Sequence, residues 1–151
     1  MSEEFIKKLG IAPTECHCKK CKAMCHAPCC GSVEDFERLI EAGYAERLML
    51  DDLPSDPNGG DMLKPALKGH EGQRSPWETS SVEGCTFWNR SGKCDLHNLG
   101  LKPTQGRLAI HDNPNCIPDS KRFASLSKED WESDRGIQLI KRWKNIVGYD
   151  P

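Results

Sequence analysis

The sequence is most constrained between residues 16 and 30, which read CHCKKCKAMCHAPCC. Six of these residues are cysteine and two are histidine, while the whole chain of 151 residues has nine cysteines. Thiols so close together are hard to keep inert, because their thiolate forms bind metal ions and react with oxidants. We therefore expect the chain to hold a metal centre through cysteine.

The spacing within this stretch supports a metal more than another use of sulfur. Cys18 and Cys21 have the CxxC spacing, with which one tight turn directs two sulfurs to one ion. Cys21, Cys25 and Cys29 then recur every four residues, on one face if the segment is helical. Cys29 and Cys30 are adjacent, and adjacent side chains diverge. Either one of that pair is not a ligand, or the two serve different centres.

A second group of sulfurs follows much later in the chain. Cys85 and Cys94 have eight residues between them and bracket a turn at Ser91–Gly92. The expected metal ligands are therefore Cys18, Cys21, Cys25, Cys29, Cys30, Cys85 and Cys94. Secondary candidates are Cys16, Cys116, His97 and His111, and for each histidine a surface or hydrogen-bonding role is the simpler alternative. Zinc takes four ligands, so two centres and one centre with spare thiols both stay open.

The apolar composition gives a second reason to expect a metal. Leu, Ile, Val and Phe together number 28 of 151 residues, which predicts a thin core. Structural zinc can supply roughly 10–16 kcal/mol of binding free energy, and this energy stabilises the fold. The three lysines between Cys18 and Met24 would offset the negative charge of the thiolates. Zinc is the simplest structural choice, and a [4Fe–4S] cluster is the alternative cofactor.

Charge and hydropathy exclude several classes of protein. The formal net charge is −2, so no global field attracts nucleic acid or a membrane. No apolar run approaches the roughly 18 residues of a membrane span. The N-terminus MSEEFIKKLG has no apolar core of a signal peptide. We expect a cytoplasmic protein, in a compartment where thiols stay reduced. A disulfide framework fits neither that compartment nor an odd cysteine count.

The predicted fold is a small, irregular and loop-rich α+β domain, stapled by metal, with two or three helices and short strands. It is one domain over residues 1–151, with a cysteine-cluster core at about 16–116 and a C-terminal helical segment at about 127–148. Ser32 is the expected N-cap of a helix that ends at Gly43. Residues 51–84, with four prolines and five glycines, predict a long loop with a short strand near Leu67.

The second half of the chain gives weaker structural signals. Residues 85–88 suit a short strand, and residues 99–116 read as a loop broken by Pro103 and Gly106. Ser127 is expected to cap one helical turn around Trp131, and Ser133 to cap a second helix that Gly148 ends. A stripe on that second helix predicts a packed face, made of Ile137, Ile140, Trp143, Ile146 and Val147.

These cysteines resemble the YkgJ-type family, which is named for a CxxCxxCC motif and described as zinc- or iron-chelating. The resemblance covers roughly residues 16–107. The intervals from Cys21 to Cys25 and from Cys25 to Cys29 are each one residue longer than the motif. The family's last cysteine corresponds to Gly106, so Cys116, His97, His111 or Cys16 would have to replace it. The family has no single established reaction, so the resemblance implies a metal and no activity.

Three functions stay open from the sequence. The first is a metal-binding accessory or interaction module whose centre is mainly structural, since no G-x-S-x-G, H-E-x-x-H or phosphate-binding loop is present. The second is an iron–sulfur protein with a redox or group-transfer role. The third is a zinc-knuckle nucleic-acid binder, which the net charge and the lack of aromatic residues between Cys16 and Cys30 disfavour. A protein partner is conceivable, and no membrane partner is expected.

Overall fold

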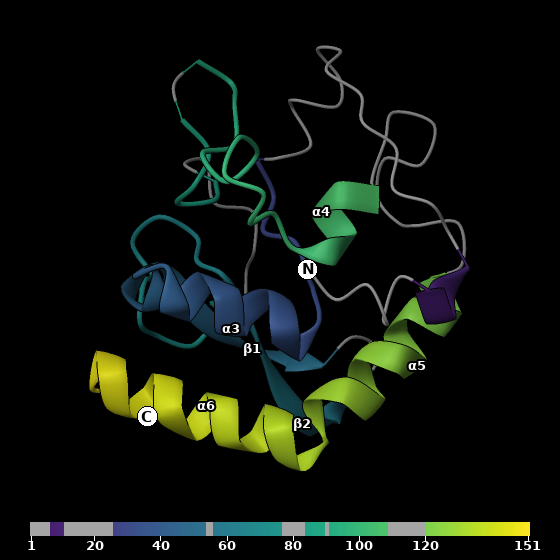
Figure 1. The fold of residues 1–151 in the computed structure, drawn as a ribbon. Coiled ribbons are helices and arrows are strands. Elements are labelled where there is room, and N and C mark those ends of the chain that lie inside the picture. The colour runs from purple at the N-terminus through teal and green to yellow at the C-terminus, as the bar shows by residue number, and fades with distance from the viewer. Residues whose placement is uncertain (1–6, 11–25, 54–55, 77–83, 90, 109–119) are drawn as a thin grey trace.

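The structure is a computed structural model that describes residues 7–10, 26–53, 56–76, 84–89, 91–108 and 120–151 (Figure 1). These residues contain in full five helices and a two-stranded antiparallel sheet, which confirms a small α+β fold. The prediction of two or three helices was too low, because the helix at Thr104–Leu108 lies in a segment whose proline and glycine suggested a loop, and the short 3₁₀ helix at Ala45–Arg47 was not predicted. The expected N-terminal ligands other than Cys29 and Cys30 lie outside the described residues.

The helix α3, Val33–Glu41, begins and ends where its capping residues predict. Ser32 is the N-cap, and its hydroxyl accepts a hydrogen bond from the Asp35 N–H, while the Asp35 carboxylate accepts one from the Ser32 N–H. Ala42 is the C-cap, and Gly43 follows with a φ of 93°. The apolar side chains of one face are fully buried. The capping box and the buried face together fix the position of this helix.

A β-hairpin replaces the long loop that the sequence predicts after residue 51. A short 3₁₀ helix, η1 (Ala45–Arg47), leads into β1, Leu48–Leu53, which pairs antiparallel with β2, Asp56–Pro65. The pairing is irregular between Asp52 and Leu53. The loop prediction was wrong because the acidic, proline and glycine residues of this segment are turn formers in sequence statistics. Here the buried residues of β1 and β2 decide the structure.

Two further segments attach to this hairpin. Residues 72–75 run beside β1, where Gly72 N–H donates to Leu48 O and Ser75 N–H donates to Leu50 O. On the other side, the strand expected near Leu67 is a single bridge between Leu67 and Cys85. The expected strand at residues 85–88 is likewise reduced to bridges, since Trp88 pairs singly with Cys94. The segment that bears Cys85 is therefore held against the end of β2.

Pro103 and Gly106, expected to break regularity, belong to a helical region. The helix α4, Thr104–Leu108, begins directly after Pro103 and includes Gly106. Proline is well tolerated at a helix start, where its missing N–H has no intrahelical partner to lose. Buried Asp35 holds this start, because its Oδ2 accepts hydrogen bonds from the Thr104 N–H at 2.9 Å and the Thr104 hydroxyl at 2.6 Å.

Two helices form the C-terminal part. The helix α5, Ser120–Trp131, contains Ser127 as a fully buried interior residue, so the predicted cap at Ser127 was wrong. The helix α6, Asp134–Val147, has the predicted caps, with the Ser133 hydroxyl accepting from Gly136 N–H and Gly148 in the left-handed conformation. Serine promotes helix starts only where its hydroxyl reaches a backbone N–H, and sequence alone does not show that.

The predicted stripe on α6 is only partly correct. Ile140 and Trp143 are buried, but Ile137 and Ile146 are 43% and 46% exposed, and Leu139 takes their place in the core. The indole N–H of Trp143 donates to Ala45 O at 2.8 Å, so this buried polar group is satisfied. None of the helices in the described ranges has the length and apolarity to cross a membrane.

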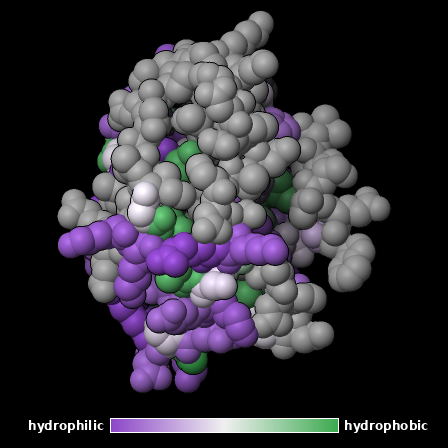
Figure 2. Space-filling model, turned by 90° about the vertical axis from the view of Figure 1, so that its right-hand side faces the viewer, coloured by the Kyte–Doolittle hydropathy of each residue, from purple (hydrophilic) through white to green (hydrophobic). Residues whose placement is uncertain are grey.

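The core lies between the hairpin and the helices, and the segment before α3 joins its parts. Gly31 O accepts the indole N–H of Trp131 at 2.9 Å, and Val33 N–H donates to Asp130 Oδ2 at 2.7 Å, so α5 is tied to the start of α3. Gly31 has no room for a side chain, since an added Cβ would lie 2.6 Å from the Asp35 carboxylate. On the face seen in Figure 2 the described surface is mainly hydrophilic, with small apolar patches.

Replacing Asp35 with alanine should strongly destabilise the protein. Asp35 is 3% exposed, and its carboxylate accepts hydrogen bonds from Ser32 and Thr104 that nothing else would satisfy. We expect Asp35→Ala to lower the free energy of unfolding by about 3 kcal/mol. The neighbouring Glu34→Ala, which removes a charge from the same helical turn, should cost less than about 1 kcal/mol. Urea unfolding followed by circular dichroism measures both, and equal losses would contradict this role.

Candidate metal centre

Four of the predicted sulfur ligands are described: Cys29 and Cys30 before α3, and Cys85 and Cys94 before α4. Cys30 and Cys85 are buried, and Cys29 and Cys94 are partly exposed. No disulfide joins any two of these four. Of the other candidate ligands, His97 is described, and six lie outside the described residues: Cys16, Cys18, Cys21, Cys25, Cys116 and His111.

His26 brings the end of the N-terminal cysteine stretch to the second group of sulfurs. Its carbonyl oxygen accepts the Cys85 N–H at 2.8 Å. Its ring packs edge-on against Trp88, with ring centroids 4.8 Å apart. Gly84 makes room for the ring, because a Cβ at Gly84 would lie 2.5 Å from His26 Nε2. Sequence reasoning assigns no role to His26. In the structure its contacts with Gly84, Cys85 and Trp88 clamp two distant segments together.

Cys85 and Cys94 lie on two chain segments that run side by side. Asn89 N–H donates to Lys93 O at 2.8 Å, and Asp95 N–H donates to Phe87 O at 2.7 Å. These bonds confirm the turn predicted at Ser91–Gly92, where Gly92 has a φ of 79°. His97, a secondary candidate, is half-buried just beyond, and its N–H donates to Cys94 O at 3.1 Å. The turn thus keeps Cys94 opposite Trp88, next to the His26 clamp.

The adjacent thiols of Cys29 and Cys30 have different surroundings, in agreement with the divergence that their sequence implies. Cys30 is 6% exposed and belongs to the apolar core. Its backbone exchanges two hydrogen bonds with Gln105, one from the Cys30 N–H to Gln105 Oε1 and one from the Gln105 N–H to Cys30 O. Burial raises the pKa of the Cys30 thiol, against the opposing effect of the Lys64 charge.

Cys29 instead packs against the backbone of α4. A Cβ built on Gly106 would lie 2.9 Å from Cys29 Sγ, and 3.0 Å from Cε of Lys102. Gly106 has helical backbone without a positive φ, so its conformation does not require glycine. Glycine in a helix is about 1 kcal/mol less favourable than alanine. Its presence here is explained by the thiol of Cys29, which occupies the space of the missing side chain.

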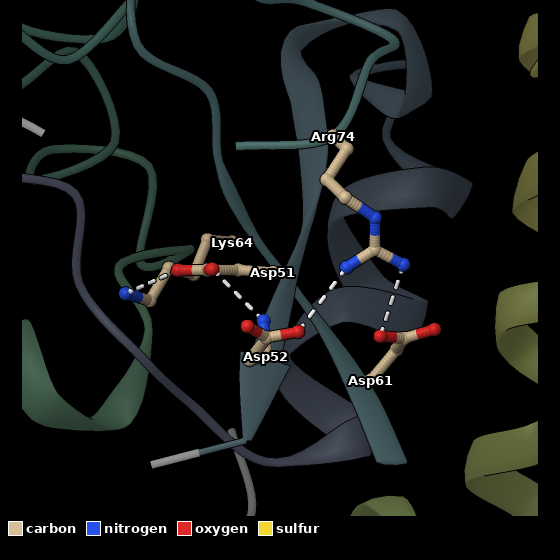
Figure 3. Close-up of polar contacts among 5 residues, drawn as sticks. All are labelled: Asp51, Asp52, Asp61, Lys64 and Arg74. Carbon is tan, nitrogen blue, oxygen red and sulfur yellow. Dashed lines mark hydrogen bonds and ion pairs between the residues drawn. The ribbon is translucent and has the colours of Figure 1, made fainter. Parts of the chain in front are cut away.

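Lys64 adds a positive charge close to these thiols. It forms an ion pair with Asp51, with Nζ and Oδ2 2.9 Å apart, and the two side chains are 20% and 23% exposed. Burial lowers the pKa of Lys64, but the fields of Cys30, Asp51 and Cys29 outweigh this effect and raise it. In Figure 3, Lys64 and Asp51 point to one side of the hairpin, while Arg74 binds Asp52 and Asp61 on the other.

The described side chains alone do not make up a metal site. Within the described ranges, no three Cys, His, Asp or Glu side chains gather in a way that could hold an ion. The described residues do show two contacts between distant segments: the Cys85 N–H donates to His26 O, and the Cys29 thiol lies beside Gly106 of α4. In Figure 1, α4 lies on the side of α3 away from α6.

Sequence reasoning missed three residues of this region: His26, Lys64 and Gly106 as a contact of Cys29. For Lys64 the sequence gives no signal, since its proximity to Cys30 depends on a hairpin that the sequence did not predict. Gly84 could have signalled a close approach, as glycine before a buried strand-like segment often does.

Comparisons with protein-family models, curated proteins and solved structures find no match to this chain.

A methyl group at Gly84 should separate the two cysteine-bearing segments. Gly84 has a φ of 73°, and its added Cβ would collide with the His26 ring. Gly69 has a similar φ of 93°, and an added Cβ there meets nothing within 4 Å. Both Gly→Ala variants carry the same backbone strain of about 1–2 kcal/mol. Gly84→Ala should lose about 1–3 kcal/mol more through overpacking.

Urea unfolding of the two variants, followed by tryptophan fluorescence, measures this difference. Gly69→Ala corrects for the left-handed backbone, so the excess loss in Gly84→Ala reports on the His26 contact. If the two variants have the same free energy of unfolding, His26 does not clamp the segments.

Proposed function

We propose that this protein binds a metal through a cluster of cysteine thiolates, and that the centre is mainly structural. The observation that carries the proposal is the hydrogen bond from Cys85 N–H to His26 O, at 2.8 Å. It joins the end of the cysteine-rich stretch to the segment of Cys85 and Cys94. A shared centre requires this meeting, since thiols from both segments must approach one ion within about 2.3 Å.

The packing around the described thiols supports a structural role. Cys30 and Cys85 are 6% and 4% exposed and lie among apolar side chains. The polar contacts of this end join elements to one another, as between Cys30 and Gln105 or between Asp35 and Thr104. A bound ion here would fasten these segments further, as in small domains that fold only with metal. The proposed protein is therefore an accessory or interaction module.

The contact between Cys29 and Gly106 also supports the resemblance to the YkgJ-type family. That resemblance aligns Gly106 with a family cysteine, and the Gly106 position lies beside the Cys29 thiol. A cysteine at this position would bring a further sulfur to Cys29. We propose membership of this family on that ground, with the sulfur at position 106 replaced by another donor.

Metal and sulfide analysis of protein prepared under nitrogen tests the centre directly. We expect stoichiometric zinc in a colourless preparation, because zinc is the simplest ion for a structural thiolate site. A brown preparation with acid-labile sulfide would instead establish the alternative, an iron–sulfur cluster. Protein with neither metal nor sulfide would refute metal binding in both forms.

Removing the ion tests whether the centre is structural. Structural zinc contributes roughly 10–16 kcal/mol of apparent binding free energy, more than a small domain has to spare. Chelation should therefore abolish the cooperative thermal transition seen by circular dichroism, and added Zn²⁺ should restore it. If the chelated protein keeps its native spectrum and melting temperature, the metal is not structural, whatever its stoichiometry.

A further inference from the structure

The outward face of α6 carries two cations, Lys141 and Arg142, which we call the basic strip. Both are exposed, and neither forms an ion pair within the described ranges. By contrast, Arg135 of the same helix is paired with Glu37 of α3. In Figure 1, α6 forms the lower edge of the molecule. A shallow surface depression at the basic strip is lined by Gln138, Lys141, Arg142, Asn145 and Ile146.

An exposed apolar side chain lies at the edge of the basic strip. Ile146 is 46% exposed, although most large apolar side chains in the described part of the chain are buried. It follows Arg135 by eleven residues, or about three helical turns, so the two lie on the same side of α6. Ile137 follows Arg135 by two residues and lies on the opposite flank. Because Arg135 reaches α3, the flank that carries Ile146 is the one that faces α3.

The neighbouring surface of α3 and η1 is acidic. Glu41 ends α3 and Glu46 lies in η1, and both are exposed. Neither forms an ion pair with any residue that the structure describes. Glu34 and Arg38 are one turn apart on α3, so their charges offset each other. Glu41 and Glu46, which we call the acidic strip, therefore carry the net charge of this surface.

The two strips are adjacent on one face of the molecule. α3 lies beside α6, and the Arg135–Glu37 ion pair joins them (Figure 1). η1 also contacts α6, since the Trp143 indole N–H donates to Ala45 O at 2.8 Å. A two-fold dimer needs a self-complementary patch, in which each feature and its complement belong to the same chain. Opposite charges side by side, with an apolar side chain at their boundary, meet that requirement.

We propose that this face binds a second copy of the chain, with the basic strip of each copy on the acidic strip of the other. Ile146 lies between the strips, close to the two-fold axis, and supplies the apolar contact. A nucleic acid fits this face less well, because Glu41 and Glu46 would repel its phosphates. The patch is smaller than a standard interface of about 1,600 Å², so we expect a dissociation constant on the order of 10 µM. The dimer does not depend on a metal.

Sedimentation equilibrium of the full chain, kept reduced so that no disulfide links two copies, measures this association. The basic reversal is Lys141→Glu with Arg142→Glu, and the acidic reversal is Glu41→Lys with Glu46→Lys. Each variant alone should self-associate at least about 100-fold more weakly than the wild type, because like charges face each other. Their equimolar mixture should associate within about tenfold of the wild type, since both contacts between unlike chains then join opposite charges.

Two matched controls separate this contact from overall charge and from exposure. Glu129→Lys with Glu132→Lys changes the net charge as much as the acidic reversal does, but at the end of α5. Its mixture with the basic reversal should stay monomeric. Ile146→Ser should weaken the wild-type association about tenfold, because it removes an apolar contact of the interface. Ile137→Ser, at 43% exposure on the opposite flank, should change it less than about twofold.

The mixtures decide the outcome. Wild-type self-association, with recovery in the mixture of the two reversals and none in the control mixture, establishes the dimer interface. A wild-type chain that stays monomeric up to about 300 µM overturns it and leaves this face to a different protein. A lack of recovery in the first mixture, or equal recovery in the control mixture, overturns it as well. Metal and sulfide analysis has no bearing on these results, so the metal centre and the dimer can fail separately.

Discussion

The structure depends on one short extended segment, residues 30–33, whose backbone is bonded to parts of the chain far away in sequence. Cys30 pairs with Gln105, Gly31 accepts from Trp131, and Val33 donates to Asp130. Buried backbone groups must be paired, so this segment can satisfy its N–H and C=O groups only when α4 and α5 are in place. This segment connects the part of the molecule that carries the thiols directly to the helical core. A substitution at Cys29 is therefore expected to disturb the packing of α3.

Much of the helical structure could be predicted because it depends on local contacts. Ser32, Ser133 and Gly148 cap helices as expected, since a cap requires only a few neighbouring residues. The hairpin β1–β2 could not be predicted from the same local preferences. Its acidic residues point to turns, but in the fold they form ion pairs with Lys64 of β2 and with Arg74 of the segment beside β1. Tertiary contacts override turn propensity there.

For the candidate site the sequence predicts thiolate chemistry, which stays a prediction, and it predicts the geometry only in part. Clustered cysteines predict a thiolate centre whatever the fold, and the meeting of the His26 and Cys85 segments is what a shared centre requires. The identity of the supporting residues depends on contacts that no local pattern encodes. From the sequence alone, Gly106 suggests a helix breaker, and only the structure shows the Cys29 thiol beside it. Lys64 likewise has no distinguishing sequence signal, because its proximity to Cys30 depends on the hairpin.

The His26–Cys85 bond also bears on the order in which the chain assembles. It closes a loop of roughly sixty residues, and the loss of chain entropy on closing that loop opposes the favourable free energy of the contact. The β1–β2 hairpin lies within that loop, and because its strands are near neighbours in sequence, closing it costs less chain entropy than closing the whole loop. Sulfurs from the two segments would thus come together late in folding. Until then the nascent chain carries its cysteines apart, in the state most open to oxidation and to capture of the wrong ion.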